Sequence, residues 1–140
     1  MSVVLAAGLG CRAGCALEQV LDVLQQALTA EGRTLAELQA LHTVDFKQSE
    51  PALQLAAELL QKPLVGFSLE QLRKCSAGAH TQSAHTLQRF GVPSIAETAA
   101  LAGAASLPQA RGPARLLAAR SSTGSATCAL AEVSVAEPPL

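Results

Sequence analysis

Ser2-Val-Val-Leu-Ala-Ala-Gly-Leu-Gly-Cys-Arg-Ala-Gly14 is the most informative segment of this 140-residue chain. It predicts a buried strand that enters a glycine-rich turn, with a long helix after the turn. Gly8, Gly10 and Gly14 would let backbone N–H groups approach a ligand, and the helix would direct its partial positive end to the same place. Arg12 adds a full positive charge. The turn is therefore a candidate site for a carboxylate or a phosphate, although an ordinary strand-to-helix turn with a surface arginine explains the same residues.

Helix and strand patterns alternate along the rest of the chain. Apolar residues at helical spacing predict a helix over residues 15–30, and Gly32 ends it. The pattern at 41–46 predicts a strand, so Lys47 lies just beyond a strand's carboxyl end. The remaining elements are, in order, a helix that starts at 49–51, a strand over 64–67, short helices over 68–74 and 83–90, a helix over 94–103, and strands over 114–120 and 126–133. The intervening segments 75–82, 104–113 and 121–125 are expected to be an exposed loop, a connector and a hairpin loop.

This order of elements predicts one α/β domain over residues 1–134, followed by a flexible tail at 135–140. The expected fold is a three-layer α/β/α sandwich with a mostly parallel mixed sheet and a C-terminal antiparallel hairpin. In such sheets, ligands bind outside the carboxyl ends of the strands. The segments 8–14, 47–50 and 94–97 are expected to converge there.

The composition excludes several classes of protein. Apolar residues make up 49% of the chain and charged residues 15%, which favours a folded core built from Ala, Leu and Val. A net charge of −1 leaves no electrostatic footprint for nucleic acid. No apolar run reaches the roughly 20 residues of a membrane helix, and the first residues lack the basic flank of a signal peptide. We therefore expect a cytoplasmic protein that binds neither nucleic acid nor membrane.

Several candidate residues also have a purely structural explanation. Glu50 and Glu97 fit the first turn of a helix, where acidic side chains complement the helix dipole. Cys11 lies where a helix end and Arg12 would lower its pKa, although a buried and inert thiol fits the same position. His80 and His85 could cover a bound ligand or ligate a metal such as cobalt, but no carboxylate or thiolate at suitable spacing accompanies them, so no metal site is expected. The spacing of the four cysteines favours free thiols.

Four segments taken together resemble the CobE family of cobalamin (vitamin B12) biosynthesis, which is similar to the C-terminal domain of CbiG. They span most of the chain and are Gly8-Leu-Gly-Cys-Arg-Ala-Gly14, Thr43-Val-Asp-Phe-Lys-Gln-Ser-Glu-Pro-Ala-Leu53, Gly91-Val-Pro-Ser-Ile-Ala-Glu-Thr-Ala-Ala-Leu101 and the final hairpin through Ala126-Thr127. Ala13 stands where the family usually has a second basic residue, and Arg120 stands where it often has a lysine. The N-terminal half of CbiG has no counterpart here, so the lactone-opening activity of CbiG is not carried over directly.

The resemblance implies a protein that binds a precorrin or a tetrapyrrole similar to hydrogenobyrinic acid and works with other cobalamin-biosynthesis enzymes, without a resident cofactor. Such ligands are wide apolar macrocycles edged with acetate and propionate carboxylates, so their site needs an apolar floor with cations and N–H donors at its rim. The segment 8–14 would hold one carboxylate, Lys47 another, and Ser94 would add a hydroxyl. The full set of candidate ligand-binding residues is Gly8, Gly10, Cys11, Arg12, Gly14, Lys47, Glu50, Ser94 and Glu97.

Two other functions stay open. An enzyme with this site would be a hydrolase that opens a precorrin lactone, with Glu50 or His85 activating water and Arg12 stabilising the oxyanion. A nucleotide- or phosphate-binding module would use the same glycine-rich segment, although this segment lacks the Gly-Lys-Ser/Thr ending of a P-loop.

Overall fold

Strands and helices alternate through most of the chain, and the last three strands follow one another directly. The computed structural model describes residues 2–136. The strands are β1 (Ser2–Cys11), β2 (Leu38–Val44), β3 (Leu64–Phe67), β4 (Ala110–Leu116), β5 (Ser121–Thr123) and β6 (Ala126–Val135). The α-helices are α1 (Leu17–Ala30), α2 (Pro51–Leu60), α3 (Leu69–Arg73), α4 (Ala84–Phe90) and α5 (Ile95–Ala105). Short 3₁₀ helices connect them at η1 (Leu35–Glu37), η2 (Asp45–Lys47) and η3 (Ser76–Gly78).

The strands form one mixed sheet in the order β3-β2-β1-β6-β4, and β5 pairs with β6. β1 and β3 are both parallel to β2, whereas β6 runs antiparallel to β1, β4 and β5. Within residues 2–136, β6 is therefore the one strand that runs against the others. This arrangement confirms the predicted mixed sheet, mostly parallel and closed by the antiparallel hairpin of β5 and β6.

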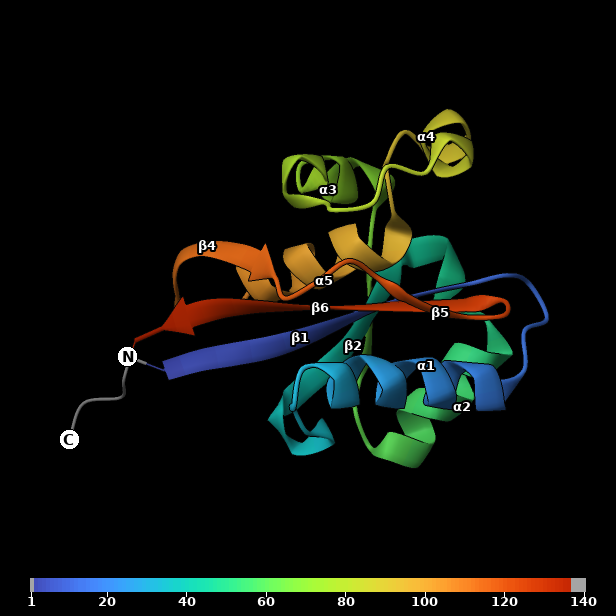
Figure 1. Ribbon diagram of the computed structural model, residues 1–140, viewed down its shortest axis with the longest axis horizontal. Coiled ribbons are helices and arrows are strands. Elements are labelled where there is room, and N and C mark those ends of the chain that lie inside the picture. The colour runs from blue at the N-terminus through green and yellow to red at the C-terminus, as the bar shows by residue number, and fades with distance from the viewer. Residues whose placement is uncertain (1, 137–140) are drawn as a thin grey trace.

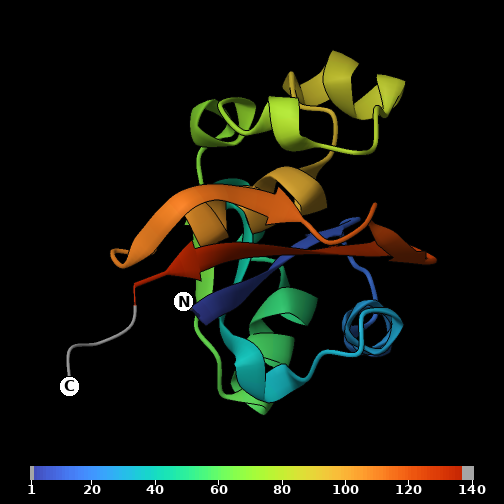
Figure 2. The same ribbon diagram turned by 60° about the vertical axis from the view of Figure 1, so that its left-hand side comes forward.

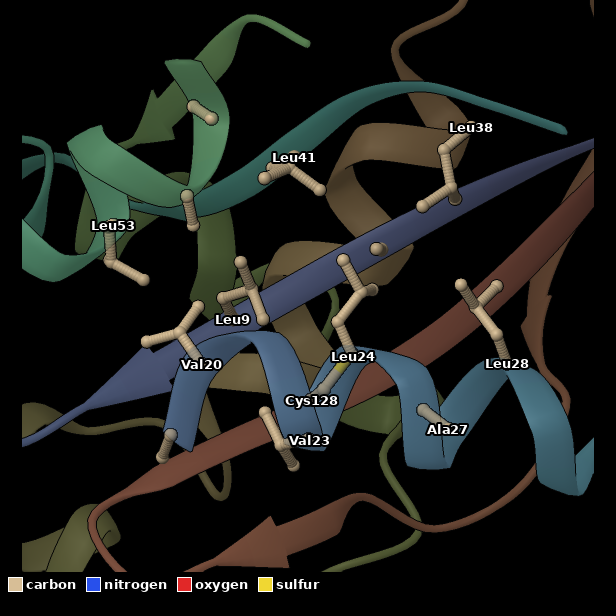
Figure 3. Close-up of a cluster of buried hydrophobic side chains, with 14 of the residues drawn as sticks. Leu9, Val20, Val23, Leu24, Ala27, Leu28, Leu38, Leu41, Leu53 and Cys128 are labelled. Carbon is tan, nitrogen blue, oxygen red and sulfur yellow. The ribbon is translucent and has the colours of Figure 1, made fainter. Parts of the chain in front are cut away.

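Helices cover both faces of the sheet and complete the predicted three-layer sandwich. α1 and α2 lie on one face and α5 on the other, while α3 and α4 stand outside α5 (Figure 1, Figure 2). Leucines dominate the core beneath α1, among them Leu9, Leu24 and Leu41 (Figure 3). On the opposite face, Ala96 and Ala100 of α5 pack against the sheet. These small side chains allow α5 to approach the strands closely.

The glycine-rich segment does not form the predicted loop. β1 runs through Gly8 and Gly10, and both residues pair with β6. A Cβ atom on Gly8 would overlap the carbonyl oxygen of Ala96 and the nitrogen of Ala100, so α5 can cross β1 only where the strand has no side chain. Gly14 alone serves a turn, with a φ of 75°. The prediction of a loop was wrong because a contact between distant elements, and not a local turn, requires glycine at position 8.

Most other elements lie within a few residues of their predicted positions, and four segments differ. Residues 117–120 are not in a strand, whereas residues 121–123, expected to be part of the hairpin loop, form β5, because their pairing with β6 leaves only Gly124 and Ser125 for the turn. Residues 110–113 belong to β4 and not to a connector, because this edge strand accommodates Gly112 at positive φ and Pro113 where its register is irregular. The alanine-rich helix continues past Gly103 to Ala105. η3 lies inside the segment 75–82 that was expected to be a loop.

The tail predicted for residues 135–140 lies largely outside the described residues. Val135 pairs with both β1 and β4 as the last residue of β6, so the sheet extends one residue into that segment. In the described part of the chain, no helix is both long enough and apolar enough to cross a bilayer.

Candidate functional site

A cleft of about 890 Å³ opens at the edge of the sheet where β1 and β2 end. Four parts of the chain surround it: the turn after β1, the segment from η2 to the start of α2, α4 with the start of α5, and the β5–β6 hairpin. Parallel strands bring their carboxyl ends to one edge of a sheet, so residues that are distant in sequence meet there. In Figure 1 this edge is on the right, below α4 and beside β5.

Six residues that the sequence singled out line this cleft, and they come from three separate segments. Arg12, which directly follows β1, and Lys47, in η2, therefore share one cavity. The six residues are Gly10, Cys11, Arg12, Lys47, Glu50 and His85.

Four other candidates lie away from the cleft: Gly8, Gly14, Ser94 and Glu97. Gly8 is covered by α5. The Gly14 N–H donates to Oε1 of Glu50 at 2.8 Å, so this donor is already used within the protein. Ser94 and Glu97 are fully buried, and the Ser94 hydroxyl oxygen accepts a hydrogen bond from the Glu97 N–H at 3.3 Å. Ser94 therefore caps α5 and does not present its hydroxyl to the cleft.

The cleft carries an excess of positive charge. Arg12, Lys47, Arg89 and Arg120 line it, against the single carboxylate of Glu50. None of these four cations forms an ion pair with any residue between positions 2 and 136. Unpaired cations in a concave site raise the local concentration of anions. The cleft is thus suited to a ligand that carries several negative charges.

One wall of the cleft is aromatic and apolar. Phe46 of η2 and Phe90 of α4 pack with their ring centroids 5.5 Å apart, and the Arg89 guanidinium lies 5.2 Å from the centroid of the Phe90 ring. Phe46 is 46% exposed and lines the cleft, so its ring is accessible to a ligand. Val44 and Ile95 extend the apolar surface. The cleft therefore combines a surface for a flat apolar ring system with cations for its acidic substituents.

Sequence reasoning missed this aromatic pair and Arg89. Phe46 and Phe90 lie on elements that are far apart in the sequence, so no local pattern indicates that they meet. One signal was available, because the chain has only three phenylalanines: Phe46 lies within the family-like segment 43–53, and Phe90 directly precedes the segment 91–101.

The thiol of Cys11 lines the cleft in a protonated form. Burial and the neighbouring Cys15 thiol raise the pKa of Cys11 to about 12, and this outweighs the opposite effect of Lys47. Since the thiolate is the reactive form, Cys11 is not an activated nucleophile. The sequence suggested that a helix end and Arg12 would lower the pKa of Cys11, but this effect does not dominate at this position.

The histidines occupy three different environments. His42 is buried in β2 and stacks on Phe67, with the ring centroids 5.7 Å apart, and burial lowers its pKa to about 4. His85 lines the cleft from α4, whereas the backbone N–H of His80 donates to Glu97. Over residues 2–136, no three His, Cys, Asp or Glu side chains are grouped in a way that could hold a metal ion.

Comparisons with known proteins place this architecture in cobalamin biosynthesis. The family model described as "Cobalamin synthesis G C-terminus" matches residues 5–131. The chain is similar to the crystal structure of CobE, a protein from the cobalamin (vitamin B12) biosynthetic pathway, with 38% identity and a TM-score of 0.88 over 98% of this chain and 95% of the other. It is also similar to cobalamin biosynthesis protein chiG from Agrobacterium tumefaciens str. C58, with 33% identity and a TM-score of 0.67 over 91% and 97% of the two chains.

A more distant likeness shows the fold alone. A cobalamin biosynthesis protein G homolog from Sulfolobus solfataricus has 13% identity and a TM-score of 0.62 over 94% of this chain but 37% of its own longer chain. Among curated protein sequences, none matches significantly.

Proposed function

This chain belongs to the family of cobalamin synthesis G C-terminal domains and is a cobalamin biosynthesis protein of the CobE type, and on that premise we propose that it binds a precorrin or corrinoid tetrapyrrole in the cleft. It acts as a carrier or accessory protein in the cytoplasm and passes the pigment to other enzymes of the pathway. Hydrogenobyrinic acid represents the chemistry of such a ligand.

The observation that carries this proposal is the meeting of an aromatic wall and four cations, none of them ion-paired with a residue from 2 to 136, in one cleft of about 890 Å³. This volume lies near the upper end of the roughly 300–1,000 Å³ range of small-molecule sites. A tetrapyrrole macrocycle is flat and apolar, and its acetate and propionate groups project from its edge. The macrocycle would lie against Phe46 and Phe90, and its carboxylates would reach Arg12, Lys47 and Arg120.

A visible-absorbance titration tests the proposal directly. Purified protein is titrated with hydrogenobyrinic acid, and the mixture is then separated by gel filtration. We expect a saturable spectral change at micromolar concentration and co-elution of pigment with protein. An unchanged spectrum together with complete separation of pigment from protein would refute the proposal.

Substitution of the cleft cations tests whether the pigment binds in this cleft. We expect Arg12→Ala and Lys47→Ala each to raise the Kd by about tenfold, since each removes a charge-assisted hydrogen bond. Lys62→Ala is the matched control, because Lys62 precedes β3 and lies at the opposite edge of the sheet. If all three variants bind the pigment equally well, the ligand does not occupy this cleft.

Hydrolysis of a precorrin lactone is the second candidate function, because Glu50 and His85 both line the cleft with Arg12. Binding is favoured over hydrolysis since Oε1 of Glu50 already accepts the Gly14 N–H, which leaves only Oε2 to activate water. Mass spectrometry of the extracted pigment separates the two functions. An unchanged mass supports a carrier, and loss of a two-carbon fragment supports a hydrolase.

The structure removes the main argument for a nucleotide- or phosphate-binding function. It required a glycine-rich loop with free N–H groups, whereas Gly8 and Gly10 lie within β1 and pair with β6. This function would again be favoured if ATP or NAD raised the thermal stability of the protein and the protein left the pigment spectrum unchanged.

A further inference from the structure

Glu97 is a fully buried acid that does not line the cleft. Its Oε1 accepts the backbone N–H groups of His80 and Thr81, both at 2.8 Å. Its Oε2 accepts the Thr81 hydroxyl at 2.6 Å and the backbone N–H of Arg120 at 2.9 Å. Both carboxylate oxygens are thus bonded twice, by two segments that are distant in the sequence.

The two segments that Glu97 holds continue directly into the walls of the cleft. Residues 80–81 precede α4, which supplies His85, Arg89 and Phe90 to one wall. Arg120 also lines the cleft and leads into β5. Glu97 itself lies in the first turn of α5, which the sheet and the alanine packing hold in place. A single carboxylate therefore connects both walls to the rigid centre of the molecule.

Apart from Phe90, which packs on Phe46 and against a buried cluster, α4 has few other attachments. It contains no buried residue, and Leu87 on it is 41% exposed. The Ser83 N–H donates to the Pro93 carbonyl oxygen at 3.1 Å, and the Arg73 side chain donates to the Phe90 carbonyl oxygen at 3.0 Å. The bonds to Glu97 consequently make a large contribution to the position of this helix.

The Glu97 side chain is also ionised, and an ionised carboxylate can accept all four hydrogen bonds. Burial acts to raise the pKa of Glu97, but the hydrogen bonds from Thr81, Arg120 and His80 outweigh burial and hold the pKa below its usual value. Glu97 is therefore ionised at neutral pH, and its charge is compensated by aligned donors and by the first turn of α5.

We infer that Glu97 is the positioning residue of the cleft: it sets the separation of α4 and the Arg120 segment, and so controls tetrapyrrole affinity without touching the ligand. This inference rests on the proposed function. It assigns to Glu97 a role different from direct ligand binding, which its position in the sequence had suggested.

A double-mutant cycle with Arg120 distinguishes positioning from general stabilisation. We expect Glu97→Gln to raise the Kd for hydrogenobyrinic acid by about tenfold, because the amide group can no longer accept from every donor. In an Arg120→Ala background, the same change should raise the Kd by only about threefold, since part of its effect passes through Arg120. Glu97→Asp, which retains the charge, should bind more tightly than Glu97→Gln. A wild-type Kd for Glu97→Gln, or equal effects in both backgrounds, would overturn the inference.

Two further measurements keep the inference testable if Glu97→Gln folds poorly or if the pigment does not bind. Thr81→Val removes only the 2.6 Å bond and should raise the Kd by about threefold while the circular dichroism spectrum stays unchanged. Hydrogen exchange at the amides of His80, Thr81 and Arg120 should accelerate in Glu97→Gln, while amides of β6 keep their protection. Failure of the wild-type protein to bind refutes the proposed function. Intact wild-type binding with unchanged exchange in Glu97→Gln refutes only this inference.

Discussion

At Gly8, the backbones of β1 and α5 are in direct contact. Gly8→Ala would force a methyl group against the Ala96 carbonyl oxygen and the Ala100 nitrogen, which can move only if α5 moves. We expect the free energy of unfolding to fall by about 3 kcal/mol, as measured by urea denaturation.

Gly10→Ala is the matched control for this prediction, since both glycines lie in the same strand. A Cβ on Gly10 would lie 2.7 Å from the Thr127 hydroxyl oxygen, and a side-chain atom of this kind can rotate away. We expect a loss of about 1 kcal/mol or less. Equal losses at both positions would contradict the conclusion that the approach of α5 requires glycine at position 8.

His42 makes stability depend on pH in a defined window. Burial lowers the pKa of His42 from 6.5 to about 4, so the folded protein binds this proton less readily than the unfolded chain. Above pH 6.5 the imidazole is neutral in both states and contributes no pH dependence. As the pH falls from 6.5 towards 4, the unfolded chain takes up the proton, and the free energy of unfolding falls by on the order of 3 kcal/mol in total.

Urea denaturation at several pH values checks this prediction, with His42→Leu as the comparison. The variant should lose most of the slope between pH 6.5 and 4.5. Glu97 and Glu37, whose pKa values are lowered, titrate in the unfolded chain near 4.5 and add their own loss of stability only at more acidic pH. The same slope in wild type and variant would show that His42 does not cause the effect.

Glu97 shows how far single residues can be understood from the sequence. The pattern from Ser94 to Glu97 predicted a capping box, and Ser94 does cap α5. The Glu97 side chain, however, binds segments that local sequence cannot place beside it. Local hydrogen bonds follow from residue spacing, but a bond to a distant segment depends on the complete fold.

Among the elements, α4 is expected to be the least protected helix beside the cleft. No residue of α4 is buried, whereas α5 is almost entirely buried. Its amides should therefore exchange with solvent much faster than those of α5, as measured by hydrogen exchange with mass spectrometry. Hydrogenobyrinic acid should slow the exchange of α4 and leave α2 unchanged. Exchange in α4 that is as slow as in α5 without ligand would contradict this prediction.

The elements that the sequence predicted well carry strong local signals. The capping box of Ser68 and Gln71 marks α3, and Gly32 at positive φ ends α1. β4 was displaced in the prediction because Gly112 and Pro113 are typical of connectors, yet an edge strand accepts both. Local composition could not distinguish the two cases, since pairing with β6 decides the outcome.

At the scale of the whole molecule, the charge is unevenly distributed. The chain has a net charge of −1, but its cleft holds four cations and one carboxylate. Pigment binding should weaken by about tenfold between 50 mM and 500 mM NaCl, because salt screens these attractions. Absorbance titration at a series of salt concentrations checks this, and an affinity independent of salt would contradict a role for the cations.

The position of the cleft was predictable, and the residues that line it were predictable only in part. Parallel strands had to bring Arg12 and Lys47 to the same edge of the sheet, and both line the cleft. Phe90 and Arg89 are in the cleft because α4 folds back over that edge, which depends on Glu97 and on the packing of Phe90 against Phe46. Such contacts depend on the complete fold, so the spacing of residues in the sequence does not predict them.

The central claim is that a tetrapyrrole occupies the cleft between α4 and the carboxyl edge of the sheet. A ¹H–¹⁵N NMR titration of the labelled protein with hydrogenobyrinic acid tests it most directly. We predict saturable shifts that concentrate on the amides of Arg12, Lys47, Phe90 and Arg120, with little change at Lys62. Shifts confined to other surfaces, or an unchanged spectrum at saturating pigment, would contradict the claim.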